Sequence, residues 1–125
     1  MADALNGKAL FIDFDSTFVK IETIDELAKL TLQDDPDEDS KIDLISGITH
    51  QAMSGEIDFP AALDRRLKIL SLTSDSIKKI THQISSLVSD SFKANRETIK
   101  EHCDDIWIVS GGFFQIIAPI VSEYG

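Results

Sequence analysis

Residues 8–14 read KALFIDF, an apolar run after Lys8 that only Asp13 interrupts. Such a run predicts a β-strand buried on both faces, as the strands of a parallel sheet are. Residues 23–26 (TIDE) follow with capping-box spacing, in which a hydroxyl residue at the N-cap precedes a carboxylate by three positions. The chain therefore begins with a strand, a short turn and a helix, which is typical of an α/β fold.

Apolar residues at helical spacing fill residues 23–90, where no stretch resembles a strand. The stripes are Ile42, Ile45, Ile48 and Ala52; Phe59, Ala62, Leu63 and Leu70; and Ile77, Ile80, Ile84, Leu87 and Val88. A second apolar strand is predicted over residues 106–109 (IWIV), with Trp107 in the core, and a helix over residues 113–123. This order of elements predicts a parallel sheet with a helical insertion.

The composition narrows the class of protein. The chain has 125 residues, 12 Lys and Arg against 22 Asp and Glu, and a formal net charge of -10. This length suits one small domain. The acidic excess disfavours nucleic acid and anionic membranes as partners, because both need a basic surface. The single Cys103 cannot form an internal disulfide, and no export or membrane segment is apparent, so we expect a cytoplasmic protein.

Polar residues follow both predicted strands. Asp13 and Asp15 lie where the first strand runs out into a turn, the edge at which parallel sheets hold their ligands. Ser110, Gly111 and Gly112 follow the second strand, and their hydroxyl and backbone amides suit a phosphate group. The alternative interpretation is a pair of helix-capping aspartates and an ordinary turn. The combination at two neighbouring strand ends favours a phosphate site.

Three groups of residues resemble those of a known family. Residues 13–17 (DFDST) with residues 22–28 (ETIDELA) resemble the first motif of phosphoserine phosphatases in the haloacid-dehalogenase superfamily. Residues 110–113 (SGGF) resemble the second motif, and residues 53–66 resemble the helical cap. The resemblance implies a partial Rossmann-like hydrolase core at residues 1–22 and 91–125, with a small helical cap inserted at residues 23–90.

The resemblance also implies roles for the polar residues at the strand ends. It implies Mg2+-dependent hydrolysis of a phosphate monoester, with O-phosphoserine as substrate and L-serine and phosphate as products, as in serine biosynthesis. Asp13 is the implied nucleophile that becomes an aspartyl-phosphate, and Asp15 is the implied acid and base. The Asp13 carboxylate and the Asp15 carbonyl would bind the metal, while Ser110 and the Gly111 amide would hold the phosphoryl oxygens.

A zwitterionic amino acid needs one acidic and one basic group in its site. Arg66 falls on an apolar helix stripe, where a guanidinium needs a partner, and the resemblance makes that partner the substrate carboxylate. The resemblance also implies that Glu22 binds the ammonium of the substrate and that Met53 packs nearby as an adaptable apolar contact. The alternatives are an Arg66 side chain that reaches solvent or pairs with an internal acid, and a Glu22 favoured by the helix N-terminus that follows.

The sequence departs from the family after the second motif. The family's third motif, a Lys, and its fourth, an acidic Gly-Asp-Gly-x-x-Asp loop, are not found: no Lys follows Lys100, and Glu123 is the only acid after Asp105. We therefore expect a fragment of a longer enzyme, with the missing C-terminal part as its partner. Two rival interpretations are a non-catalytic domain that binds a phosphorylated metabolite or a partner chain, and a phosphotransferase acting on another alcohol.

Overall fold

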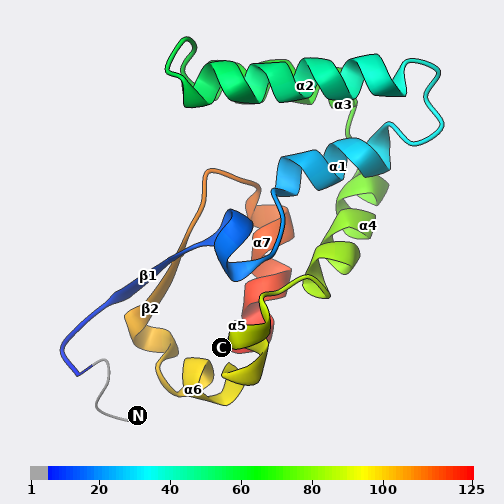
Figure 1. Ribbon diagram of the computed structural model, residues 1–125. Helices are drawn as coiled ribbons and strands as arrows, with labels where there is room; N and C mark the ends of the chain where they lie inside the picture. Colours follow the sequence, from blue (N-terminus) through cyan, green and yellow to red (C-terminus); the bar gives the residue numbers. More distant parts are fainter. Residues whose placement is uncertain (1–5) are drawn as a thin grey trace. The chain divides into compact units, whose positions relative to one another are not determined.

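The computed structural model describes residues 6–125 (Figure 1). The chain divides into two compact units. The first joins the chain up to Thr23 to Lys78–Gly125, and the second is Ile24–Ile77. The helix α4 (Ser74–Ser85) begins in the second unit and ends in the first. The predicted core and cap were divided at residues 22/23 and 90/91, and that assignment stays a prediction; residues 1–5 of the predicted core lie outside the described residues.

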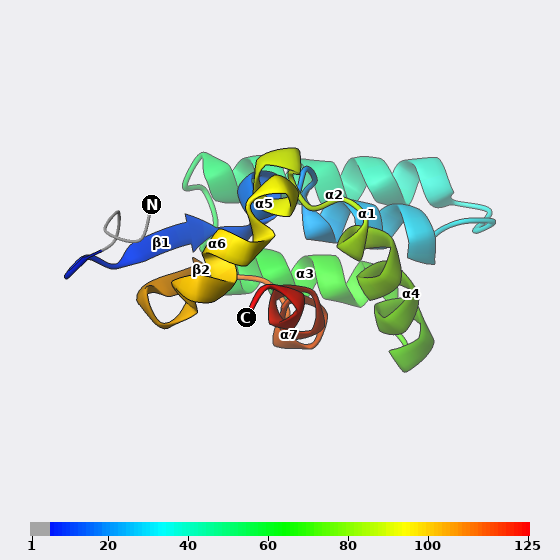
Figure 2. The same cartoon turned by 90° about the horizontal axis from the view of Figure 1, so that it is seen from below.

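The first unit holds a parallel pair of strands, β1 (Leu10–Asp13) and β2 (Ile106–Val109), which lie side by side in Figures 1 and 2. The register pairs Leu10 with Ile106 and Asp13 with Val109, so both strands end at the same edge. Parallel strands need a long crossover connection, and the helices between them provide it. The predicted α/β class with a parallel sheet and a helical insertion is confirmed.

The sheet is less buried than the sequence predicts. Phe11 and Trp107 are register partners on one face and are 66% and 57% exposed, whereas Ile12 on the opposite face is 5% exposed. The predictions of a strand buried on both faces and of Trp107 in the core are therefore wrong for the described chain. The physical reason is that successive side chains of a strand alternate between faces, and residues 6–125 cover only one of them.

The first unit also holds three further helices. They are α5 (Asp90–Ala94), α6 (Arg96–Glu101) and α7 (Phe114–Val121), with short 3-10 turns at Cys103–Asp105 and Ser122–Tyr124. In α7 the buried residues are Ile116 and Ile120, which lie on one helix face. The predicted helix over residues 113–123 is thus confirmed in its centre and is shorter at both ends.

Phe18 lies at the centre of an aromatic cluster in the first unit. Its ring centroid is 5.9 Å from that of Phe14, 5.0 Å from Phe92 and 5.1 Å from Tyr124, which meets it edge to face. Burial raises the pKa of Tyr124, and the Arg96 guanidinium lies 5.0 Å from its ring centroid. Aromatic pairs with these geometries stabilise a core beyond the area that they bury.

The two chain segments that flank the second unit are joined to each other. We call residues 17–20 and 86–90 the clasp. Val19 and Val88 form an isolated antiparallel bridge, and backbone hydrogen bonds of 2.9 and 2.8 Å flank it. Both valines are fully buried. The entry and exit of the helical segment are therefore fixed side by side within the first unit.

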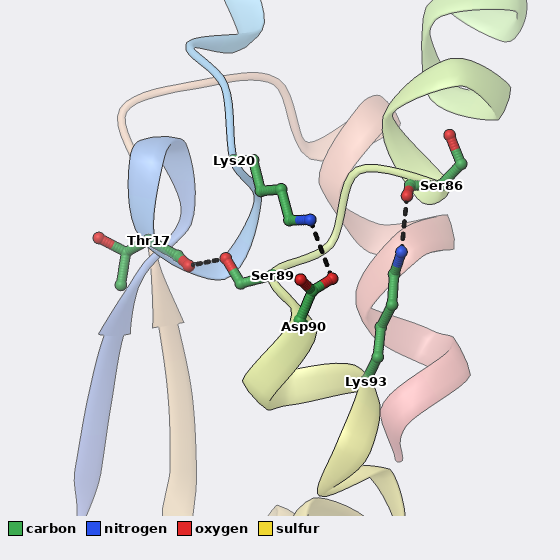
Figure 3. Close-up of polar contacts among 6 residues, drawn as sticks. All are labelled: Thr17, Lys20, Ser86, Ser89, Asp90 and Lys93. Atoms are coloured by element: carbon green, nitrogen blue, oxygen red, sulfur yellow. Dashed lines mark hydrogen bonds and ion pairs between the residues drawn. The ribbon is translucent and has the colours of Figure 1, made fainter.

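Side chains add to the clasp, as Figure 3 shows. The Ser89 hydroxyl donates to the Thr17 carbonyl over 2.5 Å, and the Lys20 ammonium lies 2.9 Å from the Asp90 carboxylate. Lys20 holds the pKa of Asp90 below its usual value. Because this ion pair is exposed to solvent, the buried valines rather than the charges carry most of the clasp's stability.

The second unit consists of α1 (Thr23–Thr31), whose first residue is the last of the first unit, α2 (Glu38–Met53) and α3 (Phe59–Leu70). The helices α2 and α3 pack against each other. Asp58 caps α3 by accepting a hydrogen bond of 2.7 Å from the Ala61 amide. Phe59, expected on the apolar stripe of this helix, is instead exposed.

No helix within residues 6–125 combines the length and the apolar character needed to cross a membrane.

We predict that Phe18→Ala lowers the free energy of unfolding by about 3–5 kcal/mol, because it removes a buried ring with three aromatic neighbours. Phe59→Ala is the matched control, since Phe59 is exposed, and we expect a loss below about 1 kcal/mol. Urea unfolding followed by circular dichroism measures both. Equal losses in the two variants would contradict the central place of Phe18.

Candidate active site

The site begins where the two strands end. Asp13 is the last residue of β1 and the register partner of Val109, the last residue of β2. Ser110 therefore leaves the sheet beside the loop that carries Asp15. Paired Cα atoms of neighbouring strands lie about 5 Å apart, so these two loops start side by side.

Gly112 is the point at which the two loops meet. Its amide donates to the Ser110 hydroxyl oxygen over 2.9 Å. A Cβ atom added to Gly112 would lie 3.1 Å from that oxygen and 3.9 Å from Oδ2 of Asp15. The Ser110 hydroxyl and the Asp15 carboxylate thus lie next to the same glycine, although 95 residues separate them in the sequence (110 against 15).

The two oxygens of Asp15 have different surroundings. Oδ1 accepts a hydrogen bond of 2.8 Å from the backbone amide of Thr23, which is the first residue of α1. Oδ2 is the atom near Gly112. A helix N-terminus favours a negative charge at this position. One oxygen is therefore held by backbone, and the other faces the Ser110 loop.

The predicted capping role of the Thr23 hydroxyl is wrong. Thr23 is buried, and its Oγ1 has no hydrogen-bond partner. The Thr23 amide, which a capping box pairs with the side chain of Glu26, instead donates to Asp15. The capping-box spacing identified the helix start correctly, but a carboxylate eight residues earlier provides the acceptor.

Glu22 is fixed by its neighbour across the loop. The Ser16 hydroxyl donates to Oε1 of Glu22 over 2.5 Å, and the Ser16 amide donates to the Ile21 carbonyl over 3.0 Å. Ser16 has a left-handed backbone, with φ 57°. Neither the hydroxyl contact nor the backbone conformation was predicted from the sequence, because a serine between Asp15 and Thr17 carries no signal for either.

Arg66 and Met53 belong to the second unit. Arg66 is 7% exposed; its Nε donates to the Ala62 carbonyl over 3.2 Å and its Nη1 to the Thr49 hydroxyl over 3.1 Å. This places the guanidinium on the buried face of α3, as its helical spacing predicts. Met53, the last residue of α2, is exposed. The other predicted site residues, Asp13, Asp15, Glu22, Ser110 and Gly111, belong to the first unit.

The residues of the first unit could supply only some of the ligands that a magnesium ion needs. Within residues 6–125, no three His, Cys, Asp or Glu side chains gather closely enough to hold a metal. Mg2+ is often bound by one or two carboxylates, with waters and phosphate oxygens completing an octahedron. The Asp13 carboxylate and the Asp15 carbonyl are oxygen ligands of the right kind, but they are few.

Known proteins resemble this chain over most of its length, although no protein-family model matches it. The phosphoserine phosphatase of Bos taurus is 28% identical over 118 residues, which are 94% of this chain and 49% of that protein. That of Archaeoglobus fulgidus is 33% identical over 119 residues, 94% of this chain and 32% of that protein. The chain thus spans about half or less of the length of these relatives.

Two solved structures have the same fold. One is a phosphoserine phosphohydrolase-like protein from Francisella tularensis, with a TM-score of 0.75 and 32% identity over 94% of this chain and 53% of that one. The other is a phospho-aspartyl intermediate analogue of phosphoserine phosphatase, with a TM-score of 0.69 and 30% identity over 94% of this chain and 52% of that one. Over nearly all of its residues, the chain is therefore similar in sequence and in fold to phosphoserine phosphatases.

Proposed function

We propose that this chain carries the phosphoryl-transfer residues of a phosphatase that acts on O-phosphoserine. The observation that carries the proposal is the meeting of Asp15 and Ser110 at Gly112, next to the paired strand ends at Asp13 and Val109. Its relatives are named phosphoserine phosphatases, and one related structure is a phospho-aspartyl intermediate analogue. A place in serine biosynthesis and a cytoplasmic location stay predictions.

The proposed reaction has two steps at one phosphorus atom. A carboxylate oxygen of Asp13 attacks phosphorus, the bond to the serine oxygen breaks, and Asp15 gives that oxygen its proton. Asp15 then takes a proton from water, whose oxygen attacks the aspartyl-phosphate and releases phosphate, which restores Asp13. Because Oδ1 of Asp15 is held by the Thr23 amide, we assign the moving proton to Oδ2.

The second loop would stabilise the charge on the phosphoryl group. The Ser110 oxygen already accepts a hydrogen bond from the Gly112 amide, so its own proton is directed elsewhere, and we assign it to a phosphoryl oxygen. The Gly111 amide is the proposed second donor. Donors fixed before the reaction stabilise the transition state without the cost of reorganisation.

Mg2+ is the proposed cofactor. The Asp13 carboxylate and the Asp15 carbonyl would hold it, and water and the substrate phosphate would complete its shell. When bound, the ion would neutralise part of the phosphoryl charge.

Glu22 and Arg66 are the proposed groups for the ammonium and the carboxylate of the substrate, and Met53 is a proposed apolar contact. The Arg66 side chain is buried and donates hydrogen bonds to Ala62 of α3 and Thr49 of α2. These contacts fix a cationic group between the two helices, which supports its proposed role. A guanidinium held in this way is suited to a bidentate carboxylate. Glu22 has an exposed carboxylate that is already oriented by Ser16.

A second function, binding of a phosphorylated metabolite without turnover, is favoured by one observation: the described residues hold no cluster of three metal-ligating side chains. Calorimetry and a phosphate-release assay separate the two functions. Binding of O-phosphoserine by this chain without release of phosphate, at any Mg2+ concentration, would support the binding function for the chain by itself, and release of phosphate would exclude it. Transfer of the phosphoryl group to an added alcohol would identify a phosphotransferase.

We predict that Asp13→Asn, made in the phosphatase whose phosphoryl-transfer residues this chain carries, lowers phosphate release from O-phosphoserine by roughly a hundredfold or more, because an amide cannot act as the nucleophile. Asp105→Asn is the matched control: it alters an exposed aspartate at the other end of the sheet and should leave the rate unchanged. The measurement is phosphate release at saturating substrate with Mg2+. Retention of the parent rate by Asp13→Asn would remove the aspartyl-phosphate mechanism.

We predict that Gly112→Ala weakens binding of inorganic phosphate by about three- to tenfold, because the new Cβ, 3.1 Å from the Ser110 oxygen, displaces the hydroxyl that would hold the anion. The melting temperature should change little, since the contacting atom belongs to a side chain. Gly47→Ala, which meets nothing within 4 Å on α2, is the control and should keep the parent affinity. Unchanged phosphate affinity in Gly112→Ala would contradict the proposed cradle.

A further inference from the structure

Three hydrogen bonds close the loop between residues 15 and 23 at its neck. They join three consecutive residues on one side to two on the other: Ser16 N–H to the Ile21 carbonyl at 3.0 Å, Ser16 Oγ to Glu22 at 2.5 Å, and the Thr23 amide to Asp15 at 2.8 Å. The backbone on both sides of Glu22, at Ile21 and Thr23, is therefore hydrogen-bonded to Ser16 and Asp15. Only the side chain of Glu22 is left to be positioned.

Ser16 pays a conformational cost to occupy its place. Its φ of 57° lies in the left-handed region, which glycine adopts freely and other residues adopt rarely. Residues held in such sparsely populated conformations are concentrated at functional sites. The atom in contact is Oγ, and its partner is Oε1 of Glu22.

We propose that Ser16 determines substrate specificity by holding the Glu22 carboxylate where the ammonium of the substrate binds. This inference rests on the proposed function, in which Glu22 receives that ammonium. The 2.5 Å contact lies in the range of hydroxyl-to-carboxylate hydrogen bonds, which are shorter and stronger than neutral ones. Without it, the exposed Glu22 side chain would sample several rotamers, and each binding event would have to select one.

The Ser16 hydroxyl orients Glu22 without blocking it. An ionised carboxylate has two oxygens with about four acceptor positions, and Ser16 occupies one of them on Oε1. The remaining positions, including both on Oε2, can accept the three N–H groups of an ammonium. Removal of the hydroxyl should therefore reduce the preference for substrates that carry an amine, and it should leave the binding of the phosphate group unchanged.

The test compares two ligands that differ only in the amine: O-phosphoserine and 3-phosphonooxypropanoate, which is the same skeleton with hydrogen in place of the ammonium. Isothermal titration calorimetry on the full chain gives the discrimination ratio, which is the dissociation constant of the amine-free ligand divided by that of O-phosphoserine. We expect Ser16→Ala to lower this ratio by about three- to tenfold through weaker binding of O-phosphoserine alone. Ser122→Ala removes another exposed hydroxyl of the first unit, one bonded to the Pro119 carbonyl, and should leave the ratio unchanged.

Two further variants separate the hydroxyl from the backbone conformation. Ser16→Gly adopts the left-handed backbone easily but lacks the hydroxyl, so it should lose discrimination as Ser16→Ala does. Ser16→Asn tolerates the same backbone and offers an amide N–H to Glu22, so it should recover part of the ratio. Circular dichroism confirms that each variant is folded. Full discrimination in Ser16→Gly would assign Ser16 a purely conformational role and overturn the proposal.

The outcomes distinguish the role of Ser16 from the proposed preference for a substrate that carries an amine. If the parent chain binds both ligands equally, the proposed preference for an amino acid ester fails, and the role of Ser16 fails with it. If the parent chain discriminates and Ser16→Gly discriminates equally well, only the role of Ser16 fails. A reduced ratio in Ser16→Ala and Ser16→Gly, with unchanged affinity for the amine-free ligand, supports both.

Discussion

The parallel pairing of β1 with β2 brings the two candidate phosphate-binding loops to one edge of the sheet. The register that places Asp13 beside Val109 makes both loops leave the sheet at one edge. Everything that could act on a phosphate follows from that edge: the Asp15 carboxylate and the Ser110 hydroxyl meet at Gly112 because their strands end together. A register shifted by a single residue would turn the alternating side chains over and separate the two loops.

Two further sets of contacts, the clasp and the hydrogen bonds between residues 15 and 23, hold the chain segments of the first unit together. The buried Val19–Val88 bridge fixes the segments that lead into and out of the second unit. The hydrogen bonds between residues 15 and 23 close the loop that ends at Thr23, the first residue of α1. The same carboxylate thus serves as a proposed proton carrier and as the acceptor for the first amide of α1, so the chemistry and the local fold share one residue.

Much of this arrangement could be predicted from the sequence, because it depends on periodicity. The apolar runs at residues 8–14 and 106–109 identified the two strands, and helical spacing identified α3 and the burial of Arg66. The short helix α5 was missed, since its five residues are too few for a periodic pattern. The exposure of Trp107 could not be predicted, because it depends on which other segments pack on that face of the sheet. The partner of the Thr23 amide could not be predicted either, because Asp15 lies outside the helix that the capping pattern describes.

The central claim is that one tetrahedral anion is shared by both strand ends. Titration of the 15N-labelled chain with inorganic phosphate, followed through backbone amide shifts, tests this directly. We expect the amides of residues 14–16 and of residues 110–112 to shift in the same titration with a single dissociation constant. Shifts confined to one of the two loops, or different dissociation constants for the two, would contradict it.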